Sequence, residues 1–118
     1  MRKYKVVFLK NNFYEMVEIY PMLGSLLYLP QNSIFESKQI ELLFSPIHKE
    51  KKILLNILNE REDYSYYHGI HTLYNPITNE SIKIQMNEYD VEVEESEHKQ
   101  IIFDILKGIS KNFYMIEL

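Results

Sequence analysis

Apolar and polar residues alternate strictly along residues 81–86 and again along residues 89–94. Successive side chains of a β-strand point to opposite faces, so each stretch predicts a half-buried strand. A two-residue loop at Asn87-Glu88 would join the two strands in a hairpin, with Ile84 opposite Val91. The buried face of this hairpin would comprise Ile82, Ile84, Met86, Tyr89, Val91 and Val93.

The polar face of the same hairpin is acidic. Asp90, Glu92 and Glu94 share one side of the second strand at intervals of about 7 Å. Lys83 is the only close counter-charge in this register. A slip by one residue would move the apolar residues into water, so the alternation specifies which face is buried.

Further strands and three helices follow from the same patterns. Strands are expected at residues 3–9, 69–74 and 113–118. Apolar residues at helical spacing from Phe13 predict a helix that ends near Tyr20, before Pro21.

The two other helices have clear start signals. Ser45 with Pro46 behind it is typical of a helix start, and that helix should end near Arg61. Ser96 is expected to cap the last helix. The fold class is therefore α+β: a single two-layer domain over residues 1–118, with an antiparallel sheet whose meander spans about residues 66–94. Two or three amphipathic helices would pack on this sheet, which includes N- and C-terminal strands.

The composition is that of an ordinary globular domain, with 46% hydrophobic and 25% charged residues. The chain has no cysteine, which excludes a disulfide framework, thiol catalysis and cysteine-based zinc sites. Alanine is absent while isoleucine occurs 15 times, which indicates a low-GC genome such as that of a bacterium or phage.

The N-terminus does not predict export. Only four consecutive apolar residues precede Lys10, whereas the apolar region of a signal peptide needs about 7–15 residues. No stretch approaches the roughly 18 apolar residues of a membrane span. We expect a cytoplasmic protein without a membrane partner.

The negative charge is concentrated in one segment. The formal net charge is −4, and residues 88–97 hold six of the 17 acidic residues and no lysine or arginine. The rest of the chain is close to neutral. This distribution argues against direct binding of nucleic acid.

The acidic segment and the tyrosines upstream of it are the candidate binding residues. One interpretation of the acidic strand is a solvated outer face that protects a sheet edge from aggregation. The other is a surface that docks into a basic groove and imitates the regular charge of a phosphate backbone. Tyrosine rings, large and rigid with a polar tip, are common at interfaces. The predicted partner-binding residues are Glu88, Asp90, Glu92, Glu94, Glu95, Tyr66, His68 and Tyr74.

Motifs for catalysis and cofactor binding are missing from the sequence. The chain has three glycines, too few for a GxGxxG or P-loop motif, and it has neither a GxSxG elbow nor an HExxH motif. His68 and His71 are three residues apart, which on a strand places them on opposite faces and argues against a shared metal. We predict no catalytic residue, no cofactor and no metal site.

A protein-binding inhibitor is therefore favoured over an enzyme. By analogy of class, we predict an immunity protein that neutralises a basic bacterial toxin, for example a nuclease, by covering its active site. A phage- or plasmid-encoded inhibitor of host defence that acts by DNA mimicry is the first alternative. A small ligand-binding domain or enzyme with a dispersed site, for which His68, His71 and Glu62 are candidates, is the second.

Overall fold

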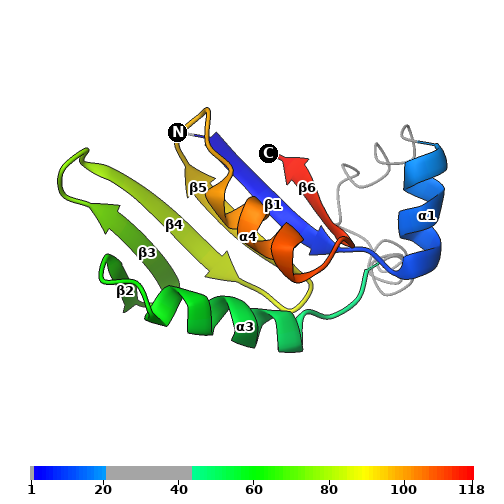
Figure 1. The fold of residues 1–118 in the computed structure, drawn as a ribbon, viewed down its shortest axis with the longest axis horizontal. Coiled ribbons are helices and arrows are strands. Elements are labelled where there is room, and N and C mark those ends of the chain that lie inside the picture. The colour runs from blue at the N-terminus through cyan, green and yellow to red at the C-terminus, as the bar shows by residue number, and fades with distance from the viewer. Residues whose placement is uncertain (1, 21–43) are drawn as a thin grey trace.

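One antiparallel sheet of six strands forms the centre of the molecule (Figure 1). The computed structural model describes residues 2–20 and 44–118. The strand order across the sheet is β2-β3-β4-β5-β1-β6. The strands are β1 (Arg2–Phe8), β2 (Tyr64–Tyr67), β3 (Ile70–Asn75), β4 (Glu80–Met86), β5 (Asp90–Glu95) and β6 (Phe113–Glu117).

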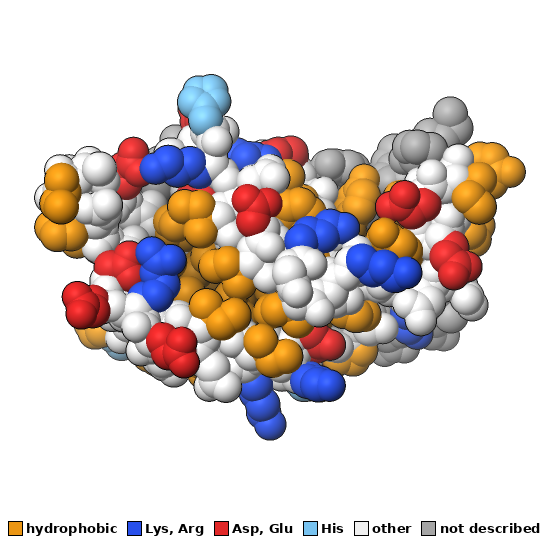
Figure 2. Space-filling model, in the orientation of Figure 1, with side chains coloured by type: hydrophobic (Ala, Val, Ile, Leu, Met, Phe, Trp, Pro, Cys, Tyr) orange, Lys and Arg blue, Asp and Glu red, His pale blue; other side chains and the backbone are white. Residues whose placement is uncertain are grey.

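Two of the helices cover one face of this sheet. The helices of the described ranges are α1 (Asn11–Ile19), α3 (His48–Asn59) and α4 (Ile101–Ile109). α3 and α4 lie together over the strands, and apolar side chains gather in their region (Figures 1 and 2). Their buried residues recur every four positions and pack into the main core: Leu54, Leu58, Ile102 and Leu106. We call this side of the sheet the helix-covered face.

The opposite face is covered at one end by a smaller core. This core contains Val7, Leu9, Phe13, Val17, Phe44 and Ile116. Phe13 and Val17 come from α1, which lies beyond the end of β1 (Figure 1). Lys3 and Lys5 share the side of β1 that carries Val7, because alternate residues of a strand share a face. We call the remainder of this side, from Lys3 and Lys5 across to β2, the open face.

The α+β class, the meander and the two terminal strands are confirmed, but the register of the β4–β5 hairpin differs from the prediction by two residues. Ile84 pairs with Val93, because four residues rather than two separate the last paired positions. Two hydrogen bonds close this longer loop. The Asn87 side chain donates to the Asp90 carboxylate at 2.6 Å, and the Asn87 N–H donates to the Asp90 carbonyl at 2.8 Å. A shift by an even number leaves each strand residue on its expected face.

Most of the predicted hairpin core is confirmed. Ile84, Val91 and Val93 are buried, and Ile82 and Met86 pack half-buried against the same core. Tyr89 is the exception, because it lies in the loop before β5 and packs against the smaller core instead.

α3 begins later than the start signal predicts. Its first residue is His48 rather than a residue at Ser45-Pro46. Tertiary hydrogen bonds hold the preceding backbone: the Ser45 N–H donates to the Phe8 carbonyl at 2.8 Å, and the Ile47 N–H donates to the Glu88 backbone carbonyl at 3.0 Å. These contacts with the sheet outweigh the local preference for a helix.

α4 also begins later, at Ile101 rather than directly after Ser96. Residues 96–99 form a turn, in which the Lys99 N–H donates to the Ser96 carbonyl at 3.0 Å. The cap comes from the sheet, since the Glu95 carboxylate accepts the Ile101 N–H at 3.0 Å.

The first helix, α1, ends at Ile19 as predicted, and Pro21 lies outside the described residues. None of the helices in residues 2–20 and 44–118 is both long and apolar enough to cross a membrane.

β2 is a separate edge strand joined to β3 by a two-residue turn. The turn residues His68 and Gly69 have φ values of 49° and 82°. Positive φ at both positions is the type I′ geometry that matches the twist of a hairpin, and glycine adopts it without a steric cost. This turn places Tyr67 and His68 beside the open face.

Candidate binding surface

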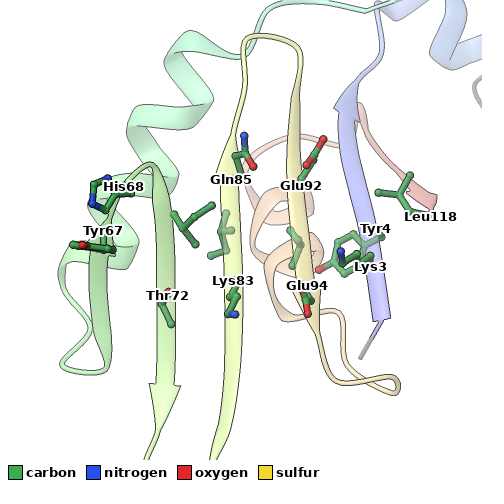
Figure 3. Close-up of a pocket in the computed structure, with 13 residues that line it drawn as sticks. Lys3, Tyr4, Tyr67, His68, Thr72, Lys83, Gln85, Glu92, Glu94 and Leu118 are labelled. Atoms are coloured by element: carbon green, nitrogen blue, oxygen red, sulfur yellow. The ribbon is translucent and has the colours of Figure 1, made fainter. Parts of the chain in front are cut away.

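The open face contains a hollow of about 450 Å³ (Figure 3). Strands β3, β4, β5 and β1 form its floor, and the β2–β3 turn forms one side. Tyr67 at this turn is 75% exposed. The aromatic and charged residues that line the hollow are Lys3, Tyr4, Tyr67, His68, Lys83, Glu92 and Glu94. We call this site the sheet hollow.

Charges in the sheet hollow alternate in sign from strand to strand. Glu94 of β5 lies directly opposite Lys83 of β4 on one side and directly opposite Lys3 of β1 on the other. In the next row, Glu92 lies opposite Lys5 of β1 on one side and opposite the uncharged Gln85 of β4 on the other. Figure 3 shows Lys83 and Glu94 side by side, with Glu92 in the neighbouring row. Directly opposed residues have Cβ atoms about 4.5–5.5 Å apart, so each of these carboxylates has a lysine beside it.

The expectation that Lys83 is the only close counter-charge is therefore wrong. The sheet order places β1 next to β5, which brings Lys3 and Lys5 to the acidic row. The local sequence of the hairpin carries no signal for this neighbour.

The charges around the sheet hollow have no partners within the described ranges. Lys3, Lys83, Glu92 and Glu94 form neither an ion pair nor a side-chain hydrogen bond with any residue of 2–20 or 44–118. The ion pairs of these ranges are Arg2–Glu117, Arg61–Asp63 and Lys99–Glu80. A ligand can therefore contact these four groups without breaking an ion pair between described residues.

Glu95 has a different environment from the rest of the acidic segment. It is fully buried on the helix-covered face, where its carboxylate accepts the Tyr4 hydroxyl at 2.5 Å and the Ile101 N–H at 3.0 Å. The Tyr4 oxygen in turn accepts the Phe103 N–H at 3.3 Å. Burial, together with the hydrogen bond to Glu95, raises the pKa of Tyr4 above its usual value. The assignment of Glu95 to a binding surface is corrected, because a completely buried side chain does not reach a partner.

Glu88 and Asp90 lie near the opposite end of β5, around a second hollow of about 290 Å³. Glu88 is exposed, whereas Asp90 is half-buried and held by the Asn87 side chain. Lys5 and Phe44 line the same hollow, so a lysine accompanies the acidic residues here too.

The predicted aromatic and histidine contacts are separated by the fold. His68 lines the sheet hollow, whereas Tyr66 is 59% exposed on the helix-covered side of β2. Tyr74 lies on the open side, outside the hollow, and its hydroxyl donates to the Asn79 side chain at 2.8 Å. Tyr67, which we did not predict, lines the hollow instead. The alternation of β2 would have identified it once the turn at His68-Gly69 was assigned.

His71 is separated from His68, as the spacing predicts. It is buried on the helix-covered face, and its Nδ1 forms a hydrogen bond of 2.7 Å with the Tyr64 hydroxyl. Burial lowers the pKa of His71. Glu62 is exposed just after α3, so these candidates for a dispersed site do not converge. Within the described ranges, no three histidine or acidic side chains are placed to hold a metal ion.

No family model matches this chain, and a search of curated proteins finds no match.

Proposed function

We propose that this protein is a cytoplasmic binding protein that neutralises another protein by covering part of its surface, as an immunity protein does for a bacterial toxin. The observation that carries this proposal is the sheet hollow, in which four charged side chains have no partner among the described residues. An exposed tyrosine stands at its edge. Tyrosine anchors beside desolvated polar groups are typical of the energetic centres of protein interfaces.

The charge pattern favours a partner of mixed charge. Basic groups of the partner would face Glu92 and Glu94, and acidic groups would face Lys3 and Lys83. DNA mimicry is less well supported, because it requires an extended surface of negative charge, whereas lysines of the neighbouring strands flank the acidic row on both sides. A basic toxin remains a suitable partner if the region that it buries here carries both signs.

The proposal is tested by affinity capture from the native host with two matched double variants. Tyr67→Ala with Glu92→Lys changes the open face. Tyr66→Ala with Glu60→Lys makes the same changes at exposed positions away from it. We expect the wild type and the second variant to capture the same protein and the first variant to lose it. Both variants are first checked for a wild-type urea midpoint.

The captured protein also has to behave as a toxin. Its expression alone should stop cell growth, and co-expression with the wild-type chain should restore it, whereas the open-face variant should not. Rescue by both variants, or capture that depends on neither face, would overturn the proposal.

A further inference from the structure

The spacing of the charges in the sheet hollow constrains the shape of the partner segment. Lys83, Glu94 and Lys3 lie in one row on three neighbouring strands, so the row reads positive, negative, positive. Neighbouring strands are about 4.8 Å apart, and the two lysine backbones are therefore about 9.6 Å apart across the face.

A helix that crosses the strands matches this spacing. One helical turn rises about 5.4 Å, so two turns advance about 10.8 Å, within about 1.2 Å of the separation of the two lysines. An extended segment repeats its side chains on one face only every 6.7 Å or so, and two repeats overshoot the row by roughly 4 Å. The spacing of this row therefore favours a helical partner segment over an extended one.

We propose that the sheet hollow receives a helix of the partner protein that lies across β4, β5 and β1 and presents an acidic, a basic and an acidic residue on successive turns. The acidic residues face Lys83 and Lys3, and the basic residue faces Glu94. Positions i, i+4 and i+7 of a helix provide this arrangement, because residues three or four apart share a face. The inference rests on the proposed function and specifies the partner segment.

The second row of charges and the side chains at the β2 side of the hollow support the same orientation of the partner helix. Glu92 and Lys5 offer a further negative and positive group beside the first row. Ile70 and Tyr67 lie at the β2 side of the hollow, where they provide an apolar contact for the helix end that extends beyond Lys83. The charges on the floor need not exchange partners on binding, since none is paired within residues 2–20 and 44–118.

The test uses two helix-stapled peptides of identical composition. One presents glutamate, lysine and glutamate at i, i+4 and i+7, and the other presents lysine, glutamate and lysine there, with the remaining charges on the far side. Binding to the full chain is measured by fluorescence anisotropy at low salt. We expect the first peptide to bind about tenfold more tightly, because three attractive pairs become three repulsive ones.

A charge-swapped protein provides the decisive comparison. The variant Lys3→Glu, Glu94→Lys and Lys83→Glu should reverse the peptide preference. The control Lys49→Glu, Lys52→Glu and Glu60→Lys makes the same net change at exposed positions of α3 and its end, and should keep the wild-type preference.

Equal binding of the two peptides, absence of binding by both, or an unreversed preference in the swapped variant would overturn the helix assignment. If capture of the native partner still depends on Tyr67 and Glu92, the proposed function survives that outcome. Capture that is independent of the open face would instead remove the proposed function, whatever the peptides do.

Discussion

Glu94 and Glu95 are neighbours in β5 and lie on opposite faces of the sheet. Glu95 is fully buried beneath α4, where it accepts hydrogen bonds from Tyr4 and from the Ile101 N–H. Glu94 is half-buried between Lys83 and Lys3 and has no ion pair within residues 2–20 and 44–118. The same residue type satisfies buried donors on one face and has no ion pair with a described residue on the other.

β1 shows a similar contrast between packed and more exposed residues, here along one side of the strand. Val7 packs under α1 with Phe13 in the smaller core, whereas Lys3 and Lys5 lie on the same side beyond that core. Every buried side-chain polar atom in the described ranges has a hydrogen-bond partner. The difference indicates that charges without an ion pair among the described residues, rather than acidity alone, mark the candidate binding surface.

Removal of the buried carboxylate should have the largest effect on stability. We expect Glu95→Ala to lower the free energy of unfolding by about 3 kcal/mol, because two buried donors lose their acceptor. α4 should fray first, since the Ile101 N–H at its start is one of those donors. Urea unfolding followed by circular dichroism measures the loss.

The matched control is the same substitution one residue earlier. Glu94→Ala should change the free energy of unfolding by less than about 0.5 kcal/mol, because that side chain satisfies no buried group. Equal losses in the two variants would remove the distinction between the faces.

A smaller effect is expected on the pH dependence of stability, and it should come from His71 on the helix-covered face. Burial lowers the pKa of His71 below its usual value near 6.5, so the unfolded chain takes up this proton first as the pH falls. Stability should therefore decrease as the pH falls through about 6.5, by at most about 1.4 kcal/mol per unit for one proton. The decrease in stability ends once the pH falls below the pKa of His71 in the folded protein.

His71→Asn should flatten this slope, and His68→Asn serves as the control for loss of a histidine outside the core. His68 is an exposed histidine at the tip of the same hairpin, and asparagine tolerates its positive φ. Urea titrations between pH 5 and 8 make the comparison. A slope that persists without His71 would assign the proton to another group.

The faces of β4 and β5 were predictable from sequence because alternation is a local property. Val91 and Val93 had to point one way and Glu92 and Glu94 the other, whatever the register. The register itself was less accessible, since the four-residue loop depends on hydrogen bonds between Asn87 and Asp90.

The candidate site was predictable only in part, because it combines distant segments. The sequence predicts Glu92, Glu94 and His68 as binding residues, and all three line the sheet hollow. Lys3 reaches them through the pairing of β1 with β5, which no local pattern encodes. Glu95 breaks the alternation of acidic and apolar residues, and its role as the cap of α4 depends on the way that helix packs on the sheet.

Carboxyl labelling of the intact protein tests the central claim most directly. A water-soluble carbodiimide with an amine probe modifies accessible carboxylates, and peptide mass spectrometry locates the product. In the free protein we predict labelling of Glu92 and Glu94 and protection of Glu95, which should react only on unfolding. Addition of the captured partner should then protect Glu92 and Glu94. Labelling of Glu95 as fast as Glu94, or labelling of Glu92 and Glu94 that the partner leaves unchanged, would contradict this account of the two faces.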